Sequence, residues 1–330
     1  MPASASVNRM TLRRAILQAM RASRFIFFSA LVMALQASPG IPAESDTVHL
    51  RILAISDFHG QLEPPGAAGR IGGVEVGGAA YLASHIATLR AGAPHSIVVS
   101  AGDLINASPF TSALFHDEPT IEAMDAIGLD LNGVGNHEFD EGVDELVRMQ
   151  RGGCHPVDGC QFGETFAGAG FTFLAANVVR EDSQETLLPS YAVRVFDGVP
   201  VAFIGVTLAN TGSMVSPSGV RGWRFRDEAQ TANQLARALR DQGVEAIVLL
   251  IHEGGHAGGG VDECPALSGP IAAIARKLEP GIDVVISGHT HQAYNCLVDG
   301  RVLTAAGSHG RVVTQIDLTL DRASRVHRSG

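Results

Sequence analysis

The 330-residue sequence contains very little lysine: of its 24 basic residues 23 are arginine, and Lys277 is the single lysine. No glycine-rich segment precedes Lys277, which excludes a Walker A phosphate-binding loop. There is no G-x-S-x-G segment either, which excludes the nucleophile elbow of an α/β-hydrolase. Acidic residues number 34, so the formal net charge is −10. This sign of charge predicts no nucleic-acid partner that binds through a basic surface.

Long apolar runs are absent as well. The run from Phe25 to Leu35 has eleven residues, whereas about 20 are needed to cross a bilayer. Five arginines and no acidic residue precede this run, and small residues and prolines follow it. That order is typical of a secretory signal. We therefore expect residues 1–38 to be a cleaved signal peptide, with no stable membrane anchor after cleavage and export to the periplasm or medium. An uncleaved anchor and a buried helix are the alternatives.

Cysteine is scarce, with four residues in the chain. In an oxidising compartment these four can form two disulfides in three connectivities. We favour pairing Cys154 with Cys160, which bracket a short loop, and Cys264 with Cys296. Zinc binding through Cys154 and Cys160 is the alternative, although their CxxxxxC spacing differs from the usual CxxC of zinc sites.

Beyond residue 45, apolar β-branched runs alternate with amphipathic stretches, which is typical of an α/β layered domain. Five expected strands matter most for function: Leu50 to Ser56, Ser96 to Ala101, Leu129 to Val134, Glu245 to Ile251 and Asp283 to Ser287. Further strands are expected at Phe171 to Ala176, Tyr191 to Phe196, Val201 to Val206 and Val312 to Leu320. Helices are expected at Ala79 to Leu89, Pro119 to Ile127, Glu141 to Gln150, Glu228 to Gln242 and Pro270 to Leu278. The glycine-rich stretch 66–78 is expected to be a loop. We expect one domain over residues 45–320, followed by a polar tail over residues 321–330.

Side chains able to bind a metal follow each of the five main strands directly. They are Asp57, His59, Asp103, Asn136, His252, His289 and His291. Ligands of open α/β sheets bind at the carboxyl ends of the strands, so these loops are expected to converge. In extended chain, residues i and i+2 point the same way, which would pair Asp57 with His59 and His289 with His291. Glycines 102, 135 and 288 would allow close backbone approach.

This set offers seven nitrogen and oxygen ligands and no thiolate. It is too large for one tetrahedral ion and suits two divalent ions that share a bridging carboxylate. We expect manganese or zinc, while iron, cobalt and calcium remain open.

The segments SDFHG, GD, GNHEFD, a strand-terminal His and GHTH, in this order, resemble the calcineurin-like metallophosphoesterase superfamily. The longer phrases SDFHGQLEP, GNHEFDEG and SGHTHQAYNC resemble its secreted bacterial 5′-nucleotidase and UDP-sugar hydrolase branch. The resemblance implies a four-layer α/β/β/α sandwich with a dinuclear metal site at the carboxyl ends of the strands. It also implies that Asp57, His59, Asp103 and His291 hold one metal, and that Asp103, as the bridge, Asn136, His252 and His289 hold the other.

His137 follows the expected ligand Asn136 directly, and an imidazole at this place can contact phosphate and protonate a leaving oxygen. The resemblance implies that Asp140 orients it. An N-cap for a helix starting at Glu141 is the other interpretation of Asp140.

The expected function is an exported phosphoester hydrolase of 5′-nucleotidase type, acting on nucleoside 5′-monophosphates or similar small esters by attack of metal-activated water. The same site acting on phosphodiesters, UDP-sugars or a thiosulfonate is an alternative, as is a truncated, weakly active metal-binding remnant. The family's C-terminal substrate-binding domain is not expected in this sequence.

Overall fold

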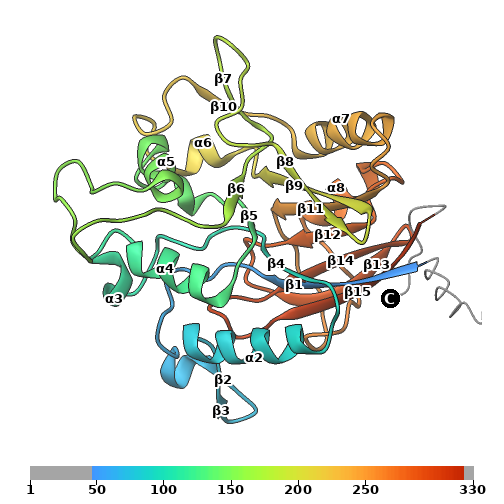
Figure 1. The fold of residues 1–330 in the computed structure, drawn as a ribbon, viewed down its shortest axis with the longest axis horizontal. Helices are drawn as coiled ribbons and strands as arrows, with labels where there is room; N and C mark the ends of the chain where they lie inside the picture. The colour runs from blue at the N-terminus through green and yellow to red at the C-terminus, as the bar shows by residue number, and fades with distance from the viewer. Residues whose placement is uncertain (1–46, 323–330) are drawn as a thin grey trace, which may run out of the picture. The chain divides into compact units, whose positions relative to one another are not determined.

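Two β-sheets organise the described part of the chain, residues 47–322 of this computed structural model (Figure 1). The expected signal peptide and residues 323–330 of the expected tail lie outside the described residues. The five-stranded sheet has the order β15 (Thr314–Asp321), β1 (Thr47–Ile55), β4 (Ser96–Ser100), β5 (Leu131–Gly133) and β6 (Thr172–Leu174). Its last four strands run parallel, and β15 pairs antiparallel with β1.

The six-stranded sheet repeats this arrangement. Its order is β13 (Ala293–Val298), β14 (Arg301–Ala306), β12 (Val284–Ser287), β11 (Ala246–His252), β9 (Val199–Thr207) and β8 (Tyr191–Phe196). The four inner strands are parallel and the two edge strands are antiparallel to their neighbours. Parallel inner strands place all their carboxyl ends at one edge of each sheet.

Alternation along the strands divides the core into layers. In β1, Leu50 and Ile52 pack in the cluster between the two sheets, whereas Leu53 and Ile55 pack in the cluster beneath the helices. Successive strand residues point to opposite faces, so both faces of this strand are apolar and buried. The first sheet is covered by α2 (Ala79–Ala91), α4 (Glu118–Ile127) and α5 (Val143–Arg151), and the second by α7 (Glu228–Asp241) and α8 (Pro270–Lys277). The four layers are therefore helix, sheet, sheet and helix, as the resemblance implied.

Local signals set the ends of several helices. The Asp227 side chain accepts the backbone N–H of Gln230 at 2.7 Å, which caps the start of α7. Gly128 ends α4 in the left-handed conformation with φ 84°. Gly142, with φ 93°, precedes α5, so this helix begins at Val143 rather than at the expected Glu141.

Short elements complete the chain. The stretch 66–78 is not a plain loop, because it contains η1 (Gly66–Gly69) and a hairpin of β2 (Arg70–Ile71) and β3 (Val74–Glu75). Other short elements that the sequence pattern did not predict include α3 (Phe110–Ala113), η2 (His137–Phe139), α6 (Thr211–Met214) and the pair β7 (Val178–Arg180) and β10 (Trp223–Phe225). These pieces are too short for hydrophobic periodicity to identify.

All four cysteines are in disulfides. Cys154 pairs with Cys160, and Cys264 pairs with Cys296, which are the favoured pairs. The second bond joins the segment after β11 to edge strand β13. Because both sulfurs of the first pair are bonded to each other, Cys154 and Cys160 offer no thiolates to a zinc ion.

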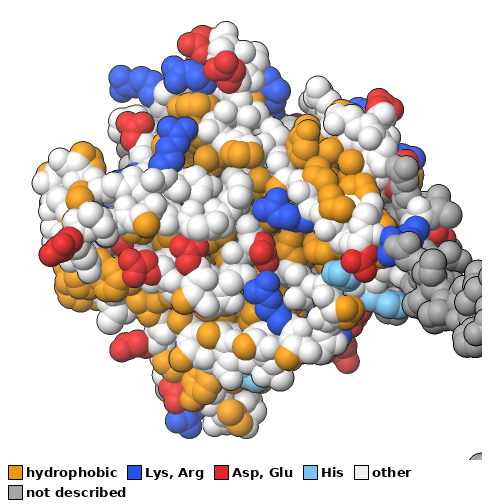
Figure 2. All heavy atoms as spheres, viewed as in Figure 1, with side chains coloured by type: hydrophobic (Ala, Val, Ile, Leu, Met, Phe, Trp, Pro, Cys, Tyr) orange, Lys and Arg blue, Asp and Glu red, His pale blue; other side chains and the backbone are white. Residues whose placement is uncertain are grey.

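Hydrophobic side chains lie exposed near the β8 edge of the second sheet, on the face drawn in Figure 2. Val193 and Val195 of this strand are exposed, and the charged Arg194 separates them. A charge on an edge strand discourages pairing with a further strand. Within the described residues, no helix is both long enough and apolar enough to span a membrane.

Candidate metal and catalytic site

The side chains expected to bind metal come together from both sheets. Asp57 and His59 follow β1, Asp103 follows β4 and Asn136 follows β5, all in the five-stranded sheet. His252 is the last residue of β11, and His289 and His291 follow β12 in the six-stranded sheet. Six of the seven fall into two groups whose ligand atoms lie within 4.8 Å of one another: Asp57 with His59 and His291, and Asp103 with His252 and His289.

In the first group, the two imidazoles face each other through ring nitrogens. Nε2 of His59 lies 3.1 Å from Nε2 of His291, which is itself 3.6 Å from Oδ1 of Asp57. Nδ1 of His59 is 2.9 Å from the carbonyl oxygen of Asn106, so Nδ1 carries the proton and donates it. In the neutral ring, Nε2 of His59 therefore carries the lone pair that a metal requires.

In the second group, a hydrogen bond at Nδ1 likewise fixes the tautomer of the neutral histidine ring. Nδ1 of His252 donates to the carbonyl oxygen of Ala101 at 2.7 Å, which leaves Nε2 as the lone-pair nitrogen. This Nε2 lies 2.9 Å from Oδ2 of Asp103. The same carboxylate oxygen is 3.8 Å from Nε2 of His59 in the first group. Asp103 thus lies between the two groups, where a bridging carboxylate would have to be.

Buried oxygens without hydrogen-bond partners mark the pocket. Oδ2 of Asp57 and Oδ1 of Asn136 are buried and have no partner among the described residues. A buried acceptor without a donor costs roughly 1–3 kcal/mol, and a cation would satisfy both oxygens. Nitrogen and oxygen donors of this kind suit divalent zinc or manganese, so the residues present fit such ions.

Burial and neighbouring charges shift the pKa values of the pocket residues in opposite directions. Burial raises the pKa of Asp57 to about 7. Burial alone would lower the pKa of His252, but the charge of Asp103 and its contact with the ring raise it to about 10. For Asp103, burial is outweighed by His252, which lowers the pKa of this carboxyl group. A site that stabilises a cation on His252 next to an ionised Asp103 has the electrostatic character of a metal site.

The backbone of these loops is not the extended chain assumed for residues i and i+2. Asp57 and His59 have φ of 51° and 49°, and His289 and His291 have φ of 70° and 54°. The left-handed conformation is costly for residues with a side chain and gathers at functional sites. Asp57 and His59 still share a group, whereas His289 and His291 belong to different groups.

Close packing explains the glycines of the loops. A Cβ atom on Gly135 would lie 2.1 Å from Oδ1 of Asp103, and one on Gly102 would lie 2.6 Å from Nδ1 of His252. Atoms this close would force the candidate ligands to move. The close approach predicted for these glycines is therefore to the side chains of the site and to neighbouring backbone.

His137 lies at the edge of the pocket with its ring half-exposed. Its Nδ1 donates to Oδ2 of Asp140 at 2.6 Å, and its backbone N–H donates to Oδ1 of Asp103 at 2.9 Å. The hydrogen bond to Asp140 is the main cause of a raised pKa for His137. Asp140 ends η2 and is not an N-cap, because α5 begins at Val143 after Gly142.

Three residues at the site were not singled out from the sequence. The buried carboxylate of Glu138 accepts the backbone N–H groups of Asp103 and Leu104 from one loop and of Gly135 from the next. Asn106 accepts from His59 and donates from its side chain to the carbonyl oxygen of His137. The ring of His309 lies 5.6 Å from that of His291. Glu138 lies within the GNHEFD segment, but nothing in the sequence pattern distinguishes a buried carboxylate there from an exposed one.

Two stacked sheets bring histidines, aspartates and an asparagine together at their carboxyl edges, an arrangement that suits a pair of divalent ions. The family comparison is specific: residues 50–293 match the model of the calcineurin-like phosphoesterases. The chain belongs to this family.

The chain is also similar in sequence and structure to individual proteins. The chain is 36% identical over 287 residues to the endonuclease YhcR of Bacillus subtilis, covering 86% of this chain and 23% of that protein. It is 28% identical over 276 residues to the NAD 5′-nucleotidase of Haemophilus influenzae, covering 82% of this chain and 40% of that protein. The solved structure of the Haemophilus influenzae NAD nucleotidase matches with a TM-score of 0.67 and 24% identity, over 86% of this chain and 55% of that one. The chain thus spans less than half the length of the two sequence relatives.

Proposed function

We propose that the chain is an exported, metal-dependent phosphomonoesterase of 5′-nucleotidase type, which releases phosphate from nucleoside 5′-monophosphates or similar small esters. The observation that carries this proposal is the pair of groups around Asp103, with His137 beside them. Its relatives include a protein named NAD 5′-nucleotidase. In this proposal, residues 45–320 form the catalytic domain, residues 1–38 are a signal peptide and residues 321–330 a polar tail.

The proposed cofactor is a pair of divalent ions, manganese or zinc. Asp57, His59 and His291 would hold one ion, and His252, His289 and Asn136 the other, with Asp103 shared between them. Ions in such a site supply charge stabilisation to phosphate oxygens and lower the pKa of water. The two buried, unpartnered oxygens of Asp57 and Asn136 support this assignment.

The remaining groups would act on the substrate directly. His137, held through Nδ1 by Asp140 at 2.6 Å, presents Nε2 to donate a proton to the departing ester oxygen. Asp140 fixes the ring orientation and stabilises the protonated form, as a carboxylate does beside a catalytic imidazole. The backbone hydrogen bond from His137 to Asp103 fixes the position of the proton donor His137 relative to the centre of the metal pocket.

Export is part of the proposal. Two disulfides within the described residues support an oxidising compartment. One relative in the comparison is named a cell wall protein, that of Listeria monocytogenes, at 33% identity over 86% of this chain. We propose a periplasmic or secreted location, with no nucleic-acid partner and no stable membrane anchor after signal cleavage.

A phosphodiester is the second candidate substrate. The observation favouring it is the 36% identity to a protein named endonuclease. The same groups could serve either ester, because the ions would bind the reacting phosphate and His137 would protonate the leaving oxygen in both cases.

Cleavage of AMP, UDP-glucose, p-nitrophenyl phosphate and bis-p-nitrophenyl phosphate tests the proposal, with manganese, zinc or a chelator added. The products followed are phosphate from AMP, UMP from UDP-glucose and p-nitrophenol from the two aryl esters. We expect AMP to be cleaved faster than the diester, with activity lost in chelator and in His137→Ala. His95→Ala is the matched control, because His95 pairs only with the exposed Asp197 at 2.9 Å. Faster cleavage of the diester would select the second candidate. No metal-stimulated cleavage of any ester would favour a weakly active metal-binding remnant.

A further inference from the structure

A second cluster of ligand-type side chains lies apart from the groups around Asp103. Nε2 of His116 is 3.0 Å from Oδ2 of Asp158, and Nδ1 of His155 is 3.2 Å from the same oxygen. The three residues offer ligand atoms that all lie within 4.8 Å of one another. Both imidazole side chains are about one-sixth exposed and the carboxylate is half-exposed, so solvent ions can reach them.

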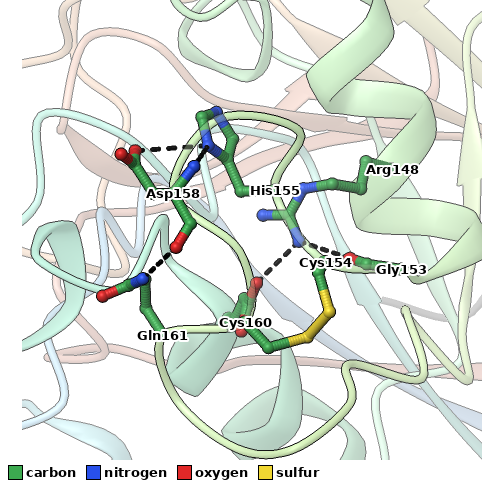
Figure 3. Close-up of a disulfide and its surroundings, with 8 residues drawn as sticks. Arg148, Gly153, Cys154, His155, Asp158, Cys160 and Gln161 are labelled. Carbon is green, nitrogen blue, oxygen red and sulfur yellow. Dashed lines mark hydrogen bonds and ion pairs between the residues drawn. A yellow bond between two sulfur atoms is a disulfide. The ribbon is translucent and has the colours of Figure 1, made fainter.

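The disulfide loop holds two of the three groups. His155 and Asp158 lie between Cys154 and Cys160, and Figure 3 shows the Asp158 carboxylate and the His155 ring facing each other on this loop. The backbone N–H of Gly159 donates to the carbonyl oxygen of His155 at 2.9 Å. A closed loop of this size limits the movement of both side chains, which reduces the entropy cost of ordering them around a ligand.

The protonation pattern leaves electron-rich atoms facing each other. Nδ1 of His155 accepts the backbone N–H of Asp158 at 3.2 Å, so this nitrogen carries a lone pair. The same nitrogen faces an anionic oxygen of Asp158. The rings of His116 and His155 stack at 3.9 Å with an interplanar angle of 12°. A single cation among the three atoms would remove this repulsion.

Glu141 supplies the feature that distinguishes a metal-binding histidine from an ordinary one. Its Oε2 lies 3.4 Å from Nδ1 of His116, on the ring edge away from Asp158. Histidines that bind metals almost always direct their other ring N–H to a carboxylate or carbonyl, which fixes the tautomer. With Nδ1 directed to Glu141, the ring nitrogen of His116 left to bind a metal is Nε2, which lies 3.0 Å from Oδ2 of Asp158. Glu145, which also lies near His116, is already held by two hydrogen bonds from Arg148.

We propose that His116, His155 and Asp158 form a peripheral binding site for a divalent transition metal, with Glu141 orienting His116. Two imidazoles and one carboxylate, with a fourth position open to water, are a ligand set of zinc. The ion links the loop between Cys154 and Cys160 to the turn at His116, because it has ligands on both segments. This proposal does not depend on the proposed function.

The turn that contains His116 and Asp117 connects this site to the main pocket through hydrogen bonds. Asp117 follows His116, and its Oδ2 accepts the backbone N–H of Asn106 at 2.8 Å. Asn106 in turn contacts His59 and His137. A zinc ion on His116 therefore stabilises a segment that borders the residues of the candidate active site.

Zinc stoichiometry tests the proposal. The metal-free protein is titrated with zinc, and bound zinc per chain is measured after gel filtration. His155→Ala and Asp158→Asn should each bind one equivalent fewer than wild type, while His95→Ala should bind the wild-type amount. His95 is the matched control because it contacts one carboxylate and has no third donor among the described residues. Unchanged stoichiometry in both loop variants would overturn the proposal.

Two further measurements separate metal binding from folding. Asp158→Asn keeps the shape of the side chain, so its circular dichroism should match wild type. The Glu141→Gln variant should bind the same number of zinc ions as wild type, but its affinity for the ion at His116 should be about 10- to 100-fold weaker. Crystals soaked in zinc should show an anomalous peak beside Nε2 of His116. Absence of this peak, with peaks present in the main pocket, would refute the site and leave His116 as a hydrogen-bond partner of Asp158.

Discussion

The Glu138 carboxylate accepts the backbone N–H of Asp103 at 3.0 Å, and so fixes the residue at the centre of the metal pocket through its main chain. Both oxygens of Glu138 accept only N–H groups, from Asp103, Leu104, Gly135 and the Asn132 side chain. Burial raises the pKa of Glu138 to about 7, and these donors offset part of that effect. The Glu138 side chain thus fixes the loop after β4 and the loop after β5 relative to each other.

Replacing Glu138 with glutamine should destabilise the protein. The amide NH₂ would face backbone N–H donors, so buried donors would lose their acceptor at about 1–3 kcal/mol each. We expect a fall of at least that size in the free energy of unfolding by urea, together with weaker metal binding. The control is Glu122→Gln, because Glu122 is exposed on α4. Equal stability of the two variants would contradict the role assigned to Glu138.

The loss caused by His137→Ala should depend on the leaving group. Without the proton donor, a ribose alkoxide leaves poorly, whereas p-nitrophenolate leaves readily without protonation. We expect kcat to fall about 10²- to 10⁴-fold for AMP and much less for p-nitrophenyl phosphate. Steady-state rates on the two esters, with metal saturating, give the comparison. An equal loss on both would mean that His137 positions phosphate and does not act as the acid.

Gly135→Ala should disable the metal pocket. The new Cβ would lie 2.1 Å from Oδ1 of Asp103, so Asp103 or the loop must move, at a cost of roughly 1–3 kcal/mol or more. Gly163→Ala is the control, since its Cβ would meet only the Thr165 carbonyl oxygen at 3.5 Å. We expect the first variant to lose metal binding measured by calorimetry and the second to retain it. Normal binding by Gly135→Ala would show that the loop relaxes freely.

Arg148→Met should be the most destabilising of the charge substitutions. Arg148 is buried and bonds Glu118 and Glu145, which are themselves buried. Removing one partner of a buried ion pair costs about 3–5 kcal/mol, because charges remain unpaired. Arg237→Met removes the exposed pair with Glu279 and should cost at most about 1 kcal/mol. Urea unfolding of both variants provides the test, and similar costs would refute the distinction.

The two disulfides should contribute unequally to stability. In the chain-entropy model, closing the longer loop between Cys264 and Cys296 stabilises the fold by about 4 kcal/mol, against about 2 kcal/mol for the loop between Cys154 and Cys160. Double serine variants of each pair, unfolded in urea, should differ in that order. The reverse order would show that local packing outweighs loop closure here.

The sequence predicted the strands and helices with strong periodicity well. β1, β4, β8, α2 and α7 lie within a few residues of their expected positions. β1, β4 and α7 bury many of their apolar side chains, whereas β8 has no fully buried residue. The hairpin of β2 and β3 and the pair β7 and β10 were missed, because two or three residues carry no measurable period. Edge strand β13 and its neighbour β14 were also missed, since polar and small residues interrupt their apolar pattern.

For the site, the sequence predicted which loops meet but not how they are held. The motifs placed Asp57, Asp103 and His252 at strand ends, and parallel strands bring such ends together. The left-handed backbone at Asp57 was missed because no local signal marks it, although aspartate adopts this conformation more often than most residues with a side chain. Glu138 was missed because its importance comes from tertiary hydrogen bonds. The cluster of His116 and His155 was missed because its members are separated by more than one helix along the chain.

The pairing of β1 with β15 affects how this fold can be joined to other segments of a longer polypeptide. Thr47 lies opposite Asp321 in that antiparallel pair, so the two boundaries of the described domain are neighbours in space. A module whose boundaries meet can be inserted into, or linked between, other modules without pulling its sheet apart. Fusion architecture in this family can therefore vary while the phosphoesterase unit keeps its internal geometry.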